Sequence, residues 1–252
     1  MPLSLATHVH GADGLGDIGA ASLAVSGAPT KESAADQLLR LGREHPGELD
    51  LLAVGPLTNL GLALRAEPDA LGRYRSVVIM GGSGPEEPVE AHLMVDANAT
   101  DDPHAADVVF APRGARLVMV GVNVTGPVVL DEGSIARIAA ADTPQARFAS
   151  RILPFYTDFY SRQLSSRVAS MHDPLAAGVL LDPTLVMGDL RAAVSVLKVE
   201  RCWRAVAPRH PALGVQGRPR TRVFTEVDGR RFLERLLAGL VAPLPIRPGG
   251  EA

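Results

Sequence analysis

Three short apolar runs, each followed by a glycine, limit what this chain can fold into. They cover residues 51–54, 76–80 and 115–120, a length typical of buried strands. Residues 57–66, between the first two runs, carry leucines at helical spacing. Strands that alternate with helices are joined by right-handed crossovers, which produce a parallel sheet. We therefore predict an α/β fold: an open, mostly parallel sheet with helices on both faces.

The rest of the chain predicts further helices and strands but no internal repeat or linker. A single domain over residues 1–252 is expected, with a frayed tail from residue 243, which is rich in proline and glycine. The first 30 residues contain no convincing strand. Pro154 is expected to kink or divide its helix. Helices are predicted near residues 33–45, 131–141, 145–163, 173–181 and 228–240, and strands within 193–206 and 221–227.

Composition narrows the classes of partner. The chain has 25 basic and 28 acidic residues, intermixed, with a net charge of −3, so no basic surface for nucleic acid or anionic membrane is expected. A small neutral substrate fits this charge distribution better than a nucleic acid or an anionic membrane does. The most apolar stretch, residues 117–130, is broken by glycine and proline and is too short to span a membrane. Cys202 is the single cysteine, which fits a reducing compartment, and we expect a cytoplasmic protein.

The sequence His172-Asp173-Pro174 places an imidazole beside a carboxylate at the start of a predicted helix. Asp173 suits an N-cap and Pro174 suits the first helical position, so a purely structural interpretation is open. That interpretation leaves His172 unexplained. An imidazole at the start of a helix is also a setting for acid/base or metal chemistry.

Other polar and aromatic groups fall near predicted loops. Asn98, which precedes the predicted helix start at Asp102, is suited either to capping backbone or to binding a sugar hydroxyl. Tyr156 and Tyr160 are four residues apart and share a helix face, as core residues or as a lid over a ring. His10 lies in a glycine-rich loop with His8, but two histidines without a third ligand are a weak metal signal.

Several of these segments together resemble the inosine–uridine-preferring nucleoside hydrolases, in the same order and over about residues 8–240. Each block is weak alone, and their ordered set is specific. The blocks are His10-Gly11-Ala12-Asp13-Gly14-Leu15-Gly16, Gly55-Pro56-Leu57-Thr58-Asn59, Met80-Gly81-Gly82, Asp96-Ala97-Asn98 with Asp102-Pro103, Asn123-Val124-Thr125 and His172-Asp173-Pro174-Leu175.

The resemblance implies calcium-dependent hydrolysis of ribonucleosides to ribose and free base. By position, Asp173 and the main-chain carbonyl of Val54 match calcium ligands, and His172 matches the histidine that protonates the leaving base. Residues that match sugar-binding or base-binding positions are Asn98 and Asp96 for the ribose, and His10, Tyr156 and Tyr160 for the base. A ribonucleoside is thus the expected partner, and the sequence leaves a homo-oligomer open.

The chain departs from the family at its start. It has no segment of the form Asp-x-Asp-x-Gly-x-Asp-Asp, which in the family supplies most calcium ligands, and we expect the first strand to be missing. Calcium takes six to eight oxygens, so Asp173 and Val54 do not complete a site. Glu86, Glu87 and Glu90 are either substitutes or solvated loop charges. Three hypotheses remain: a hydrolase whose start lies upstream, a non-catalytic nucleoside-binding remnant, or an interaction module that uses an uncovered sheet edge.

Overall fold

The computed structural model describes residues 6–19, 30–85, 96–112, 114–199, 202–208 and 217–243. The chain divides into two compact units. The sheet unit comprises residues 1–4, 27–127 and 172–228, and the helical unit comprises residues 5–26, 128–171 and 229–252. Residues 244–252 of the predicted tail lie outside the described ranges. Within those ranges, no helix is long and apolar enough to cross a bilayer.

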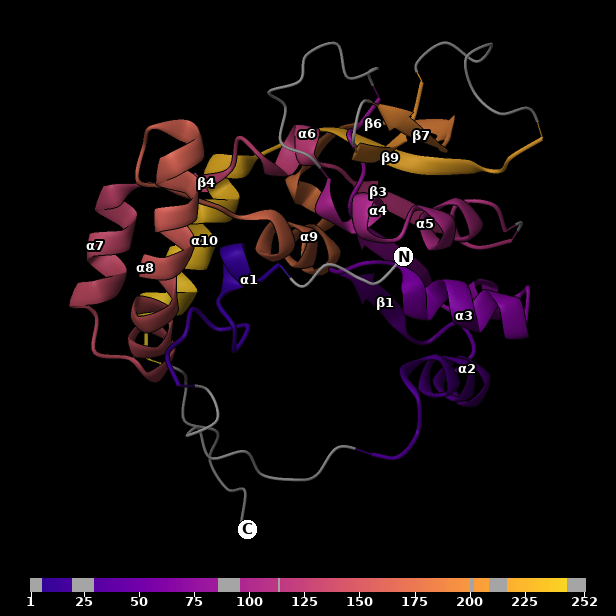
Figure 1. The fold of residues 1–252 in the computed structure, drawn as a ribbon, viewed down its shortest axis with the longest axis horizontal. Coiled ribbons are helices and arrows are strands. Elements are labelled where there is room, and N and C mark those ends of the chain that lie inside the picture. Colours follow the sequence, from indigo (N-terminus) through magenta and orange to yellow (C-terminus); the bar gives the residue numbers. More distant parts are fainter. Residues whose placement is uncertain are drawn as a thin grey trace. The chain divides into compact units, whose positions relative to one another are not determined.

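The sheet unit is built on five strands in the order β1-β2-β3-β9-β6 (Figure 1). The first three pairs in this order are parallel, and β6 runs antiparallel to β9. The predicted mostly parallel sheet is therefore confirmed. Among the described residues, no strand precedes β1. The strands are β1 (Asp50–Ala53), β2 (Ser76–Met80), β3 (Leu117–Val120), β6 (Val186–Ala193) and β9 (Arg220–Val227).

Alternating residues of β2 face two different helical layers. Val77 and Ile79 belong to a buried cluster with residues of α3 (Thr58–Ala66) and α5 (Pro103–Val109). Val78 and Met80 are also buried, outside that cluster, and α9 (His172–Leu181) packs against β2. Figure 1 shows α3 and α9 on opposite sides of the strands. The apolar run in β2 is continuous because both of its faces are covered.

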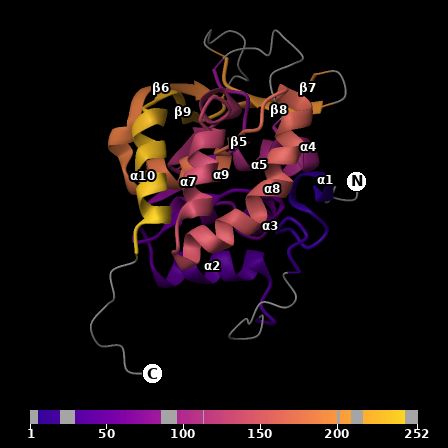
Figure 2. The same cartoon turned by 90° about the vertical axis from the view of Figure 1, so that its left-hand side faces the viewer.

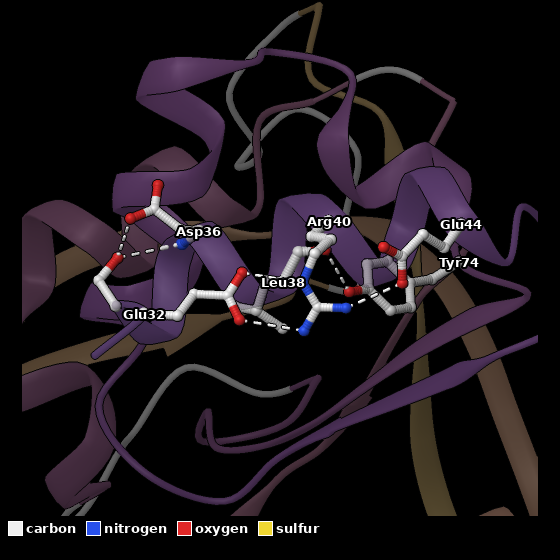
Figure 3. A network of polar contacts seen from close by, with 7 residues as sticks. Glu32, Asp36, Leu38, Arg40, Glu44 and Tyr74 are labelled. Atoms are coloured by element: carbon white, nitrogen blue, oxygen red, sulfur yellow. Dashed lines mark hydrogen bonds and ion pairs between the residues drawn. The ribbon is translucent and has the colours of Figure 1, made fainter. Parts of the chain in front are cut away.

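Helix α2 (Ala34–Glu44) carries an exposed ion-pair network (Figure 3). The Arg40 guanidinium donates to both carboxylate oxygens of Glu32, at 2.9 and 3.0 Å, and to Glu44 at 2.8 Å. The hydrogen bond from Arg40 lowers the pKa of Glu32 below its ordinary value. Exposed pairs contribute little to stability. The buried Tyr74 adds a firmer attachment, because its hydroxyl donates to the carbonyl of Leu38 at 2.7 Å.

The remaining elements of the sheet unit correct one prediction. The single strand expected within residues 193–206 is an antiparallel hairpin of β7 (Ser195–Val199) and β8 (Cys202–Val206). Strand β6 was not predicted. The short helices of this unit are η2 (Ala70–Arg73), α4 (Ala97–Asp101), α6 (Val122–Thr125) and η3 (Pro183–Leu185).

Helices α7 (Glu132–Ala140), α8 (Pro144–Leu164) and α10 (Gly229–Val241) make up most of the described helical unit (Figure 2). Thr143 caps α8 by accepting from the backbone N–H of Ala146 at 3.1 Å, and its hydroxyl donates to the carbonyl of Leu240 in α10 at 2.5 Å. Helix α8 continues through Pro154, so of the two expected outcomes a division of the helix is wrong, and a kink stays a prediction. The elements are α1 (Thr7–His10), β4 (Val129–Leu130), α7 (Glu132–Ala140), α8 (Pro144–Leu164), β5 (Ala169–Ser170) and α10 (Gly229–Val241).

A buried carboxylate, Asp96, joins the end of β2 to α4. Its Oδ2 accepts from the backbone N–H of Gly82 at 2.6 Å, and its Oδ1 accepts from that of Ala99 at 3.2 Å. Asp96 is only 2% exposed, and burial raises its pKa to about 6 although the backbone donors oppose the shift. The carboxyl therefore holds the glycine loop and the helix start in one arrangement.

Two leucines of α3 test the packing of the main cluster. Leu64 is 5% exposed and Leu62 is 46% exposed, so Leu64→Ala leaves a cavity whereas Leu62→Ala removes surface atoms. We expect Leu64→Ala to lower the free energy of unfolding by about 2–5 kcal/mol and Leu62→Ala by less than about 1 kcal/mol. Urea denaturation of both variants measures the difference, and equal losses would contradict this assignment of the core.

The raised pKa of Asp96 predicts that the free energy of unfolding depends on pH. The folded state binds the proton of Asp96 more tightly than the unfolded state does, because the pKa is about 6 in the folded state and 3.8 in the unfolded state. The protonated carboxyl therefore stabilises the fold fully below pH 4, and this stabilisation is lost as the pH rises through 6. Between pH 4 and 7, the parent protein should lose on the order of 3 kcal/mol more unfolding free energy than Asp96→Asn. Urea unfolding at several pH values measures both curves. Curves of equal slope would show that Asp96 does not titrate in this range.

Candidate active site

The parallel pairing of β1, β2 and β3 places their carboxyl ends at one edge of the sheet, where open α/β sheets bind ligands. Val54 follows β1 directly and is 41% exposed. Nearby, Thr58 donates its hydroxyl to Asp102 Oδ2 at 2.6 Å, and Asp102 caps α5 through the N–H of Ala105 at 3.0 Å. The blocks at Gly55-Pro56 and Asp102-Pro103 thus connect two helices beside this edge.

The glycines after β2 are required by backbone geometry. Gly82 has a φ of +90°, and a Cβ there would overlap the side chain of Met119. Gly84 has a φ of +91°, and a Cβ there would overlap Asn123. Only glycine adopts such conformations readily at close approach. The Met80-Gly81-Gly82 block is therefore explained by the turn itself.

Asn98 precedes α5, whose start at Asp102 and Pro103 was predicted, but it lies within the short helix α4, which was not predicted. Its Nδ2 donates to the carbonyl of Met80 at 3.0 Å, which orients the amide at the carboxyl end of β2. A cavity of about 10 Å³ beside Asn98, Asp96 and Gly82 has room for roughly one water molecule and not for a sugar. Both carboxylate oxygens of Asp96 already accept backbone hydrogen bonds, so its predicted contact with ribose stays a prediction.

His172 is held by Thr125, a residue for which no role was predicted. The Oγ1 atom of Thr125, at the end of α6, lies 2.6 Å from Nδ1 of His172, across 47 residues of chain. Thr125 is fully buried, and burial lowers the pKa of His172 to about 4. The imidazole is therefore neutral at neutral pH. The Asn123-Val124-Thr125 block after a predicted strand was the only sequence signal for Thr125, and it did not indicate that Thr125 contacts His172.

Asp173 lies inside the first turn of α9, because the helix begins at His172. The prediction that Asp173 is the N-cap and Pro174 the first helical residue is wrong by two positions. The Asp173 residue as a whole is exposed, but desolvation of its carboxyl by the surrounding protein raises the pKa to about 6. Its position at a helix start favours the charged form and opposes that shift.

The described residues do not form a complete calcium site. No group of three or more histidine, cysteine, aspartate or glutamate residues that could hold a metal occurs within the described ranges. Asp173 and the carbonyl of Val54 are oxygen donors of the right type, but calcium takes six to eight oxygens. Glu86, Glu87 and Glu90, considered above as substitutes, lie outside the described residues. The residues present therefore do not fit the ion on their own.

The helical unit contains the predicted aromatic group. The rings of His10 and Tyr156 stack, with centroids 5.8 Å apart and planes 15° from parallel. Tyr156 and Tyr160 share a face as predicted, with hydroxyls 3.2 Å apart, and the Tyr156 hydroxyl donates to the carbonyl of Ser170 at 3.1 Å. Partial burial and the nearby His8 lower the pKa of His10. Tyr160 is 3% exposed, so it supports the cluster from within.

The loop after His10 is ordered by its own carboxylates. Asp13 Oδ1 accepts from the N–H of Asp17 at 2.9 Å, while Asp17 Oδ1 accepts from that of Ala12 at 2.6 Å. Arg151 of α8 donates to the carbonyl of Ile18 at 2.9 Å. These contacts give Asp13, in the first signature block, and the adjacent Asp17 a structural role in ordering the loop, which Arg151 attaches to α8.

The structure thus distributes the predicted site residues over both units. The sheet unit contains Val54, Asp96, Asn98, His172 and Asp173, and the helical unit contains His10, Tyr156 and Tyr160.

Comparison with known proteins agrees with the signature blocks. Residues 1–234 match the family described as inosine-uridine preferring nucleoside hydrolase. Uridine nucleosidase 1 of Arabidopsis thaliana is 32% identical over 185 residues, which cover 72% of this chain and 53% of that protein. The inosine-uridine preferring nucleoside hydrolase of Crithidia fasciculata is 31% identical over 182 residues, 72% of this chain and 56% of that protein.

Solved structures extend the similarity over most of the chain. A plant nucleoside hydrolase superposes with a TM-score of 0.83 at 27% identity, covering 96% of this chain and 77% of that one. A purine-preferring ribonucleoside hydrolase from Gardnerella vaginalis gives 0.75 at 27% identity, with 93% and 74% covered. The chain spans about half the length of the curated relatives it matches. By the family match over nearly its whole length, this chain belongs to the inosine-uridine preferring nucleoside hydrolase family.

Proposed function

We propose that this protein hydrolyses the N-glycosidic bond of ribonucleosides and releases ribose and a free base. The observation that carries the proposal is the pairing of Thr125 with His172, 2.6 Å apart, directly before Asp173 at the start of α9. It places a neutral imidazole next to a carboxylate at the edge of a parallel sheet. Membership of the nucleoside hydrolase family supports the same reaction class.

The residues match the charges that this reaction develops. Breaking the bond builds positive charge on the ribose and negative charge on the departing base, and catalysis requires groups that bind these charges more tightly in the transition state. A carboxylate such as Asp173 stabilises the positive sugar. The amide of Asn98, already oriented by Met80, offers its Oδ1 to a sugar hydroxyl. Because His172 is neutral, it stabilises the negative charge on the departing base by donating a hydrogen bond from its ring N–H and does not transfer a proton.

The aromatic cluster of the helical unit suits a planar base. The stacked rings of His10 and Tyr156 present large, flat, partly accessible surfaces, and aromatic rings favour offset stacking on other rings. Tyr160 fixes Tyr156 through the contact between their hydroxyls. We assign the cluster to contact with the base.

Calcium enters the proposal as the ion that the family resemblance implies. When bound, such an ion would supply a site for the attacking water and for the ribose hydroxyls. Asp173 and Val54 are the donors this chain would contribute, and they do not complete a site by themselves. No step of the reaction is therefore assigned to the ion.

Release of free base from inosine, uridine and cytidine tests the proposed reaction. We expect the purified chain to liberate base from at least one of the three, and parallel assays in EGTA and after addition of calcium chloride show whether the reaction needs the ion. Chromatographic separation of base and nucleoside measures the product. No release from any substrate, with or without calcium, would overturn the proposal.

His172 should matter most where the leaving base is poor. We expect His172→Ala to lower turnover of inosine or uridine by roughly 10²–10³-fold, because a hydrogen-bond donor aimed at developing negative charge contributes about that much. 4-Nitrophenyl riboside, whose leaving group needs no proton, should be affected much less. His104→Ala, at an exposed position of α5, is the matched control and should leave both rates unchanged. Equal losses on both substrates would contradict this role of His172 as a hydrogen-bond donor to the leaving base.

A further inference from the structure

The hydroxyl of Thr125 is buried with a single partner. Thr125 is fully buried, and within the described part of the chain its Oγ1 has one hydrogen-bond partner, Nδ1 of His172 at 2.6 Å. A hydroxyl carries one proton, and a buried donor without an acceptor costs roughly 1–3 kcal/mol. The proton of Thr125 therefore has to be donated to His172.

This requirement selects one form of the imidazole ring. A neutral imidazole carries its proton on one nitrogen and accepts at the other. If Nδ1 of His172 carried the proton, it would donate to Thr125, and the threonine hydroxyl proton would have no acceptor among the described residues. If Nδ1 is unprotonated, both groups are satisfied. The second arrangement leaves the ring proton on Nε2.

The backbone on both sides of this contact is anchored. Val122, the first residue of α6, donates its N–H to the carbonyl of Gly82 at 2.8 Å, and Asn123 Nδ2 donates to the carbonyl of Phe224 in β9 at 3.0 Å. His172 begins α9, which packs on β1 and β2 and contacts α6. Thr125 is thus presented to His172 by elements fixed to the central sheet.

We propose that Thr125 is a positioning residue whose hydroxyl donates to Nδ1 of His172 and holds the ring in the tautomer that carries its proton on Nε2. In this tautomer Nε2 of His172 is a hydrogen-bond donor, which is the type of group that an acceptor atom of a leaving nucleobase requires. The assignment of the tautomer stands on the geometry alone, and its catalytic consequence rests on the proposed function.

Nuclear magnetic resonance of ¹⁵N-histidine-labelled protein tests the tautomer without any assay of activity. The chain has seven histidines, and the resonances missing from His172→Gln identify those of His172. At pH 7.5 we expect Nδ1 of His172 to resonate as an unprotonated, hydrogen-bonded nitrogen and Nε2 as a protonated one. A protonated Nδ1 in the parent protein would overturn the proposal.

Three substitutions separate positioning from packing. Thr125→Val keeps the shape but removes the hydroxyl, and should mix the two tautomers. Thr125→Ser retains the hydroxyl and should keep the parent spectrum. Thr221→Val makes the same change at a buried threonine of β9 whose hydroxyl has no partner among the described residues, and should leave His172 unaffected. An unchanged His172 spectrum in Thr125→Val would contradict the proposal.

Kinetics of the same variants test the catalytic consequence. We expect Thr125→Val to lower kcat for nucleosides by ~10–100-fold, the usual effect of removing a group that orients a functional side chain, with little change in KM. Turnover of 4-nitrophenyl riboside should change far less, and Thr125→Ser should recover activity. Normal nucleoside turnover in Thr125→Val would overturn the catalytic part. If the parent protein releases no base at all, the proposed function fails, while the spectra still decide the tautomer.

Discussion

The parallel register of β1, β2 and β3 is the constraint on which the polar groups of the sheet unit depend. Because the strands run in one direction, the loop after each begins at the same edge, and Val54, Gly82 and the start of α6 all follow from that register. Covered faces make the register stable, since a shift along β2 would remove Val77 and Ile79 from their cluster. The position of Thr125 is in this sense a consequence of packing in the core.

Local patterns were sufficient to predict most elements of this sheet. Continuous apolar runs identified β1 to β3, and capping residues placed helix starts, as at Ser33, which accepts from the N–H of Asp36. Strand β6 was missed because Gly188, Asp189 and Arg191 interrupt its apolar residues and most of its positions are half-buried or exposed. The hairpin of β7 and β8 was taken as one strand, because Glu200 and Arg201 carry no turn signal. Pairing in a hairpin is decided by contacts that a single strand's pattern does not contain.

The candidate site was predictable by residue type but not by hydrogen-bond partner. The sequence selected His172 and Asn98, yet it could not indicate that Met80 orients the Asn98 amide or that Thr125 reaches His172 over 47 residues. Such pairings depend on how the elements pack. Asp96 shows the converse, because an acidic residue suited to ribose is buried as a helix cap, with both oxygens accepting from backbone.

Burial shifts three ionisable groups of the sheet unit, Asp96, His172 and Asp173, toward their neutral forms, and this bears on the proposed chemistry. The pKa values of Asp96 and Asp173 are raised to about 6, and that of His172 is lowered to about 4. A carboxylate that is poorly solvated in the free protein gains more from an adjacent positive charge than a well-solvated one does. For Asp173, such a charge arises on the ribose only as the glycosidic bond breaks, so the interaction is stronger in the transition state than in the ground state, which is the condition for catalysis.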